Sequence, residues 1–206
     1  MFMTTFLSFV RHGQVHNPDQ IYYGRLPGFR LDAKGCDQAK LAAQALRSTP
    51  LAALFSSPLL RARQTAREIL RFHPALKLKV SRLIHEVYTP FEGRPSAETD
   101  ALNGDVYTGT VPPFEQPIDI LNRAQKFVRR VRKHYAGRHA VAVTHGDAIT
   151  FMILWAKNLS LLPEYKGKMA PLGIPGGYPA PASITTFAFR TDSLEELPQV
   201  KYVKPY

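Results

Sequence analysis

The tripeptide Arg11, His12 and Gly13 has the clearest chemical potential in this 206-residue chain, and it directly follows an apolar run at residues 6–10. A neutral histidine nitrogen can attack phosphorus and form a phosphoramidate that water then hydrolyses. An arginine guanidinium offers paired donors that match phosphoryl oxygens, and a glycine lets the backbone approach a ligand closely. Taken alone, the tripeptide more often belongs to an ordinary loop.

Two further segments place basic side chains where a predicted strand passes into a predicted helix. Arg61 falls in the first turn of a helix that Ser57 and Pro58 open, where free backbone N–H groups favour an anion. His145 follows an apolar run at residues 140–144 in the same way. Each has a simpler interpretation by itself: Arg61 as a surface arginine, and His145 as a capping or hydrogen-bonded loop histidine.

A carboxylic acid for proton transfer is available between residues 85 and 93. A general acid protonates a leaving alkoxide and later activates water, and Glu86 can do both if its surroundings keep it protonated. The competing interpretation is a solvated loop acid. Glu92 is the other candidate, but it directly precedes Gly93, and an acid before glycine more often serves a turn or cap. We therefore favour Glu86.

Alternating strand and helix patterns predict the frame that must position these residues. Strands are predicted at residues 6–10, 51–56, 76–80, 140–144 and 183–190, and helices at residues 33–47, 58–72, 118–135 and 146–157. The alternation indicates an α/β fold, a three-layer α/β/α sandwich around a mostly parallel sheet. Ligands bind beyond the carboxyl ends of such strands, so we expect His12, Arg61 and His145 to meet at one edge.

The length of 206 residues fits one domain, and we expect a single domain over residues 1–206. The segment from about residue 84 to 117 has no clear periodicity, and we expect it to be an insertion that covers the substrate. Aromatic side chains in loops 21–30, 88–117 and 169–181 either contact a ring-bearing leaving group or pack the loops down. We favour the second interpretation.

Composition indicates an ordinary globular protein, since 45% of residues are hydrophobic and 21% are charged. A single cysteine, Cys36, cannot form an internal disulfide, which is typical of a reducing compartment. We expect Cys36 to be an ordinary small residue. No signal-peptide pattern and no apolar run of the roughly 18–20 residues that a membrane span needs is evident. We therefore expect a soluble, cytoplasmic protein without membrane partners.

The formal net charge of +11 leaves three explanations open. The densest basic run, residues 129–133, lies on the polar face of a predicted helix. It can be a solvated face, a field that steers anionic substrates, or a nucleic-acid contact. We favour the solvated face and expect no nucleic-acid partner, because no RNA- or DNA-binding motif accompanies the run. No sequence feature indicates an oligomeric state.

Taken together and in their order along the chain, the motifs around His12, Arg61, Glu86 and His145 resemble those of the histidine phosphatase superfamily, also called the phosphoglycerate-mutase-like superfamily. The match extends from Ser8 to about Asp147. The chain departs from the family's usual pattern at Gln14, where glutamate is common, and at Pro90, where glycine is common. The resemblance implies an α/β fold and phosphoryl-transfer chemistry on a small phosphorylated substrate.

The resemblance also implies a role for each matched residue. His12 corresponds to the nucleophile, Glu86 to the general acid and base, and Arg11, Arg61 and His145 to the groups that bind the phosphoryl group. In the loop after the signature, Asn17 is the candidate for a further phosphate contact, with a spacing one residue shorter than the common form.

The implied mechanism is phosphoryl transfer by positioning and charge neutralisation. Arg11, Arg61 and a protonated His145 supply positive charge, so we expect no metal and no cofactor. The histidines also lack the ligand spacing of the H-E-x-x-H or C-x-x-C kind. His12 must be neutral at its attacking nitrogen, and its other ring nitrogen should donate to a carbonyl or similar acceptor.

The sequence thus predicts a metal-independent, acid-type phosphomonoester hydrolase with a phosphohistidine intermediate and a small phosphorylated metabolite as substrate. Two alternatives remain open. A phosphoglycerate mutase would use the same histidine but return the phosphoryl group to the substrate; this chain is shorter than the mutases it resembles. A non-catalytic phosphate-binding regulatory domain is the other, and the intact set of His12, Arg61, Glu86 and His145 argues against it.

Overall fold

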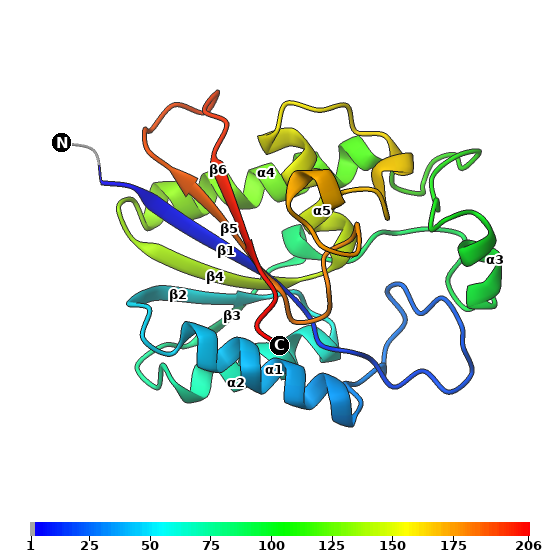
Figure 1. Ribbon diagram of the computed structural model, residues 1–206, viewed down its shortest axis with the longest axis horizontal. Coiled ribbons are helices and arrows are strands. Elements are labelled where there is room, and N and C mark those ends of the chain that lie inside the picture. Colours follow the sequence, from blue (N-terminus) through cyan, green and yellow to red (C-terminus); the bar gives the residue numbers. More distant parts are fainter. Residues whose placement is uncertain (1–2) are drawn as a thin grey trace.

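The computed structural model describes residues 3–206, which form a six-stranded sheet in the order β3-β2-β4-β1-β5-β6 with helices on both faces (Figure 1). The strands are β1 (Thr5–Arg11), β2 (Leu51–Ser56), β3 (Leu78–Val80), β4 (His139–Thr144), β5 (Ile184–Phe189) and β6 (Gln199–Val203). The helices are α1 (Ala33–Leu46), α2 (Leu60–Arg71), α3 (Ser96–Ala101), α4 (Pro117–His134) and α5 (Gly146–Ala156). Short 3-10 turns occur at Arg82–Ile84, Pro163–Tyr165 and Ala170–Leu172.

The predicted three-layer sandwich and mostly parallel sheet are confirmed. Strands β3, β2, β4 and β1 run parallel to one another. Strand β5 pairs antiparallel with β1, and β6 pairs antiparallel with β5. Strand β6 was not predicted. It lies at the edge of the sheet and its side chains alternate between exposed and half-buried, so its sequence shows little of the hydrophobic signal that identifies a strand.

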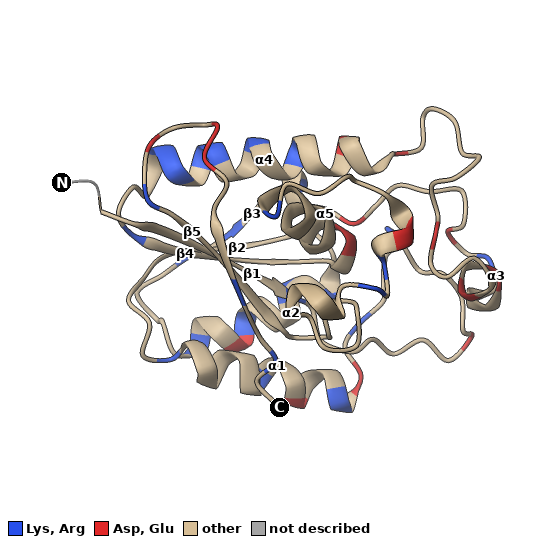
Figure 2. Ribbon diagram, turned by 45° about the horizontal axis from the view of Figure 1, so that its top comes forward, with Lys and Arg blue, Asp and Glu red and all other residues tan. Residues whose placement is uncertain are grey.

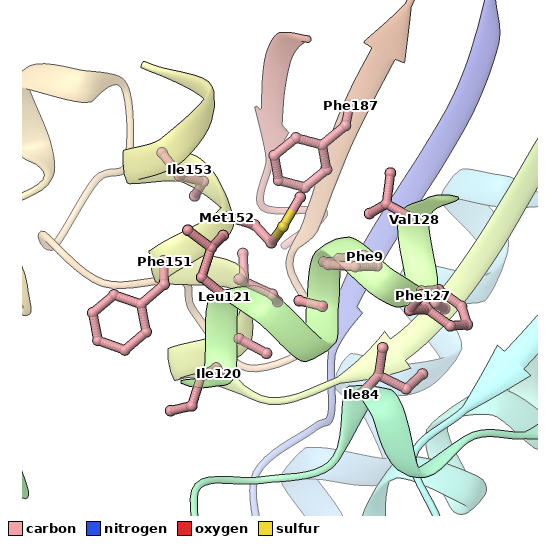
Figure 3. Packing of buried hydrophobic residues seen from close by; sticks show 14 of the residues in the cluster. Phe9, Ile84, Ile120, Leu121, Phe127, Val128, Phe151, Met152, Ile153 and Phe187 are labelled. Carbon is pink, nitrogen blue, oxygen red and sulfur yellow. The ribbon is translucent and has the colours of Figure 1, made fainter. Parts of the chain in front are cut away.

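Two apolar layers hold the helices to the sheet. Alternate residues of a strand face opposite sides, so β1 presents Phe9 to one layer and Val10 to the other. The layer under α4 and α5 contains large aromatic side chains, among them Phe9, Phe127 and Phe187 (Figure 3). The layer under α1 and α2 is built mainly from alanine and branched aliphatic residues, which lets those helices approach the sheet closely.

Helix α4 has the amphipathic pattern that the sequence predicts. Its buried residues recur at helical spacing: Ile120, Leu121, Ala124, Phe127, Val128 and Val131. Arg129, Arg130 and Lys133 are exposed, and Figure 2 shows basic residues along the outer side of this helix. The exposure of these side chains supports the solvated-face interpretation of the basic run.

Helix α5 is the most apolar helix, and nearly all of its residues are buried. Its 11 residues are far short of the roughly 20 that span a bilayer, and it packs beside α4 against the sheet (Figure 1). Within residues 3–206, no helix is both long and apolar enough to cross a membrane.

The register of the parallel strands brings three chain segments together. Arg11 at the end of β1 pairs with Thr144 at the end of β4, and Ser56 at the end of β2 pairs with Val143. The pairing continues beyond the strands, since the His12 N–H donates to the Thr144 carbonyl at 3.0 Å. The residues that follow β1, β2 and β4 therefore lie side by side at one edge, as expected for this fold class.

Candidate active site

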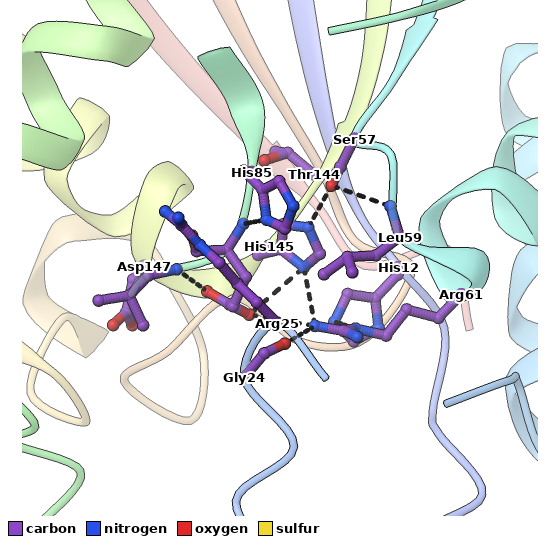
Figure 4. Close-up of polar contacts among 12 residues, drawn as sticks. His12, Gly24, Arg25, Ser57, Leu59, Arg61, His85, Thr144, His145 and Asp147 are labelled. Carbon is purple, nitrogen blue, oxygen red and sulfur yellow. Dashed lines mark hydrogen bonds and ion pairs between the residues drawn. The ribbon is translucent and has the colours of Figure 1, made fainter. Parts of the chain in front are cut away.

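His12 is buried directly after β1, with only 3% of its surface exposed. Its Nδ1 lies 2.8 Å from the Gly13 carbonyl and donates to it, as expected from the sequence. Nε2 therefore carries no proton, and its lone pair accepts a hydrogen bond from Arg61 Nε at 3.2 Å (Figure 4). Burial, Arg61 and His145 together lower the pKa of His12 well below its ordinary value. Nε2 is thus an unprotonated nitrogen beside a fixed positive charge.

Gly13 is required by the packing of its own loop. A Cβ at this position would lie 2.3 Å from the carbonyl oxygen of Gly35 in α1. The Gly13 N–H donates to Thr65 of α2 at 3.1 Å. From the sequence, this glycine was expected to allow close approach to a ligand, whereas the structure shows that its missing side chain makes room for the backbone of helix α1.

Arg61 is not a surface arginine, because its side chain is completely buried. It lies in the first turn of α2, and its Nη2 donates to the Gly24 carbonyl at 2.7 Å. The same atom is 3.7 Å from a carboxylate oxygen of Glu86, and the Tyr23 ring covers the guanidinium at 4.7 Å. Within residues 3–206, Nη1 is buried without a hydrogen-bond partner, so a donor remains for an incoming acceptor.

His145 connects Glu86 to Ser57. Its Nδ1 lies 3.3 Å from Glu86 Oε2, and its Nε2 lies 2.7 Å from the Ser57 hydroxyl. Burial lowers the pKa of His145 to about 4, and Glu86 only partly offsets that effect. Burial also raises the pKa of Glu86, but His145, Arg61 and the Val87 N–H outweigh it and hold that pKa well below its usual range.

The protonation states of this pair bear on the expected positive charge of His145. The directions of the two pKa shifts favour a neutral His145 and an ionised Glu86 near pH 7, because complete burial next to Arg61 disfavours a second cation. A protonated His145 stays a prediction for the complex with a phosphoryl group. A bound oxyanion beside these groups would raise both pKa values again.

The remaining candidates divide between the site and its surroundings. Arg11 donates to the Pro179 carbonyl at 2.6 Å, and its Nε is buried without a partner among residues 3–206. Asn17 is engaged elsewhere: its amide donates to the Ile21 carbonyl at 2.9 Å. Glu92 accepts from the Arg25 N–H at 2.6 Å. The structure thus brings Arg11 to the cluster but leaves Asn17 outside it.

Comparison with known proteins identifies the family. The model of the histidine phosphatase superfamily (branch 1) matches residues 7–173. The chain belongs to this superfamily. An uncharacterised protein of Mycobacterium tuberculosis is 39% identical over 143 residues, covering 66% of this chain and 70% of that protein. The fructose-2,6-bisphosphatase TIGAR of Bos taurus is 34% identical over 133 residues, covering 60% of this chain and 49% of that protein.

Solved structures show the same fold. A mycobacterial glucosyl-3-phosphoglycerate phosphatase superposes with a TM-score of 0.75 at 22% identity, covering 97% of both chains. A phosphoserine phosphatase from Entamoeba histolytica, solved with 3-phosphoglyceric acid, has a TM-score of 0.72 at 22% identity, covering 96% of both chains. The family resemblance inferred from the motifs is thus confirmed.

The centre of this histidine phosphatase is better suited to an anion than to a metal ion. Ligand atoms of His12, Glu86 and His145 all lie within 4.8 Å of one another, a spacing that a cation can bridge. The Arg61 guanidinium, however, lies in the same cluster, 3.2 Å from His12 Nε2 and 3.7 Å from Glu86. A fixed positive charge at this distance opposes a bound cation and attracts a phosphoryl group.

A cavity of about 390 Å³ opens beside the cluster and includes Arg11 and Glu86 in its wall. Its other lining residues are Ile21, Tyr22, Tyr23, Gly24, Ser96, Thr99, Asp100, Asn103, Gly104, Asp147, Lys166, Gly167 and Tyr178. All three predicted loop regions contribute to this wall. The segment at Lys166 and Gly167 was missed, because no motif or periodicity distinguishes it in the sequence.

Only some of the aromatic residues in these loops line the cavity. Tyr22, Tyr23 and Tyr178 do so. Phe29 instead stacks on Tyr23, with ring centroids 5.2 Å apart, and Tyr88 packs on Phe114 at 5.2 Å. The predicted packing role therefore holds for part of the set, while three tyrosines face the space where a leaving group would lie.

Asp147 organises the loops around this cavity, a role that sequence reasoning missed. It is 3% exposed at the start of α5. It accepts from Tyr178 at 2.5 Å, from Lys166 at 2.9 Å and from the Tyr107 hydroxyl. Lys166 also donates to the Gly104 carbonyl at 2.5 Å. One carboxylate thus connects α5 with three loop segments.

Removing this carboxylate should destabilise the protein markedly. Asp147→Ala leaves Lys166, whose side chain is 9% exposed, without its ion-pair partner and two tyrosine hydroxyls without their acceptor, which should lower the free energy of unfolding by about 3–5 kcal/mol. Urea unfolding measures the effect. The control is Asp37→Ala, which breaks the exposed pair with Lys40 at 2.7 Å and should leave the unfolding midpoint unchanged. Equal effects of the two substitutions would contradict the role of Asp147.

Proposed function

We propose that this histidine phosphatase hydrolyses a small phosphomonoester through a covalent phosphohistidine on His12. The observation that carries the proposal is the state of His12 Nε2: unprotonated, buried, and 3.2 Å from the Arg61 guanidinium. Because burial and Arg61 hold its pKa well below the ordinary value of histidine, this nitrogen stays nucleophilic in mildly acidic solution. Activity should therefore extend below neutral pH, in keeping with an acid-type phosphatase.

Arginine donors neutralise the phosphoryl oxygens in this proposal. Arg11 Nε and Arg61 Nη1 are buried donors without a partner among residues 3–206, and an unsatisfied buried donor is costly unless something occupies it. A phosphoryl group would satisfy both. It would also compete with the Gly24 carbonyl for Arg61 Nη2, so oxyanion binding should move the 22–24 segment. Asn17 needs no part in this scheme.

Two displacements complete the reaction. In the first, His12 Nε2 forms a bond to phosphorus as the ester P–O bond breaks, and Glu86 donates a proton to the leaving oxygen. In the second, water attacks phosphorus, gives a proton to Glu86, and the N–P bond breaks. The pKa of Glu86 lies well below its usual range, so the proton that it donates enters with the substrate. A monoester monoanion beside a carboxylate has the same number of protons as a dianion beside a carboxylic acid.

The decisive experiment measures which product forms and whether a metal is needed. The protein is incubated with p-nitrophenyl phosphate, and separately with 3-phosphoglycerate and a bisphosphate primer, each with and without excess EDTA. We expect phosphate release in the first reaction, unchanged by EDTA and inhibited by vanadate. Isomerisation without net phosphate release would identify a mutase. Loss of activity on chelation, restored by a divalent ion, would contradict a metal-independent mechanism.

A further inference from the structure

Among residues 3–206, the part of the cavity wall away from Arg11 and Glu86 carries no free positive charge. Lys166 is the cation there, and it is 9% exposed and paired with Asp147 at 2.9 Å. Its Nζ also donates to the Gly104 carbonyl at 2.5 Å, so most of its donor capacity is used. The charges of Lys166 and Asp147 therefore cancel, and Lys166 is not available to bind an anionic leaving group.

The remaining charged group in this region is acidic. Asp100 at the end of α3 lines the cavity and is exposed. Among residues 3–206 it makes no ion pair, so its negative charge is uncompensated. An anionic group in this space would be repelled by the Asp100 carboxylate, and it would have no unpaired cation there to bind.

The uncharged part of the wall is aromatic and hydroxylated. Tyr22, Tyr23 and Tyr178 provide ring faces, and Ser96 and Thr99 provide hydroxyl groups. A volume of about 390 Å³ lies within the range of small-molecule sites. These features suit a leaving group with hydroxyls and a ring or carbon skeleton, up to the size of a nucleoside.

We propose that this protein selects phosphomonoesters whose leaving group is uncharged and hydroxylated, and that Asp100 discriminates against substrates with a second anionic group. The proposal rests on the proposed phosphatase activity and adds its substrate class. It separates this chain from its relative named as a fructose-2,6-bisphosphatase, because a second phosphate needs a free cation, and the described cavity wall offers none beyond Arg11, which is assigned to the reacting phosphoryl group.

Matched substrate pairs test the proposal. Glycerol 1-phosphate and 3-phosphoglycerate differ in a hydroxymethyl group against a carboxylate, and glucitol 6-phosphate and 6-phosphogluconate differ in the same way. We expect kcat/KM to be higher, on the order of tenfold, for the member of each pair whose leaving group is uncharged. This is the size of effect that one unfavourable charge contact produces. p-Nitrophenyl phosphate serves as the reference substrate.

Two charge-reversal variants locate the cause. Asp100→Lys should raise kcat/KM for the carboxylate substrates and reduce the preference at least several-fold. Asp192→Lys makes the same change of net charge on an exposed residue outside the cavity wall and should leave the ratio unchanged. A wild-type preference for the anionic members, or a ratio that Asp100→Lys does not alter, would overturn the proposal. Absence of hydrolysis of every monoester, p-nitrophenyl phosphate included, would instead overturn the proposed function.

Discussion

Replacing His12 with alanine is expected to reduce turnover by about 10⁴-fold or more, since loss of a nucleophile removes the covalent route altogether. The side chain is almost fully buried and its Nδ1 donates to the Gly13 carbonyl, so water cannot take over its position in the same geometry. His16→Ala is the matched control: His16 is exposed in the following loop, and its removal should leave kcat unchanged.

Trapping the intermediate shows which residue carries the phosphate. Rapid quenching of the wild type with labelled substrate should yield a phosphoprotein that is labile in acid and stable in base, mapped to the peptide containing His12. Ser57 is the natural competitor, because its hydroxyl lies 2.7 Å from His145 Nε2. It is completely buried, and phosphoserine has the opposite lability. An acid-stable label on Ser57 would show that the assignment of the nucleophile is wrong.

The second large effect is expected for Glu86→Gln, and its size should depend on the leaving group. An alkoxide must be protonated as it departs, whereas nitrophenolate leaves unaided. Loss of a general acid costs roughly 10²–10⁴ in rate, so the phosphorylation step should fall by that factor with alkyl phosphates and only slightly with p-nitrophenyl phosphate. Single-turnover kinetics separates this step from hydrolysis of the intermediate.

Glu92→Gln provides the comparison for Glu86. Glu92 accepts from the Arg25 N–H at 2.6 Å, and burial raises its pKa, yet it is not in contact with His12 or His145. Its replacement should lower rates equally for all leaving groups, through displacement of the loop that carries Gly24. The reverse pattern, with a leaving-group dependence for Glu92→Gln alone, would identify Glu92 as the acid.

Much of the fold and of the site was predictable because the relevant signals are local. A short apolar run before His12 and another before His145 predict buried strands, and parallel strands end at a common edge. The prediction that Arg61 joins them follows from the same rule. The placement of these residues in one cluster thus needed only the order of elements and the motifs between them.

Only the tertiary structure decided the charges, the cavity and the sheet edge. The pKa of His145 is lowered mainly because its side chain is completely buried, with a smaller contribution from Arg61, and burial has no local signature. Asp147 and Lys166 meet across a separation of 19 residues, and the Tyr178 hydroxyl reaches the same carboxylate from 31 residues away. Sequence motifs determine which groups can act on a phosphoryl group, whereas desolvation and long-range contacts determine their protonation, their partners and the space left for the substrate.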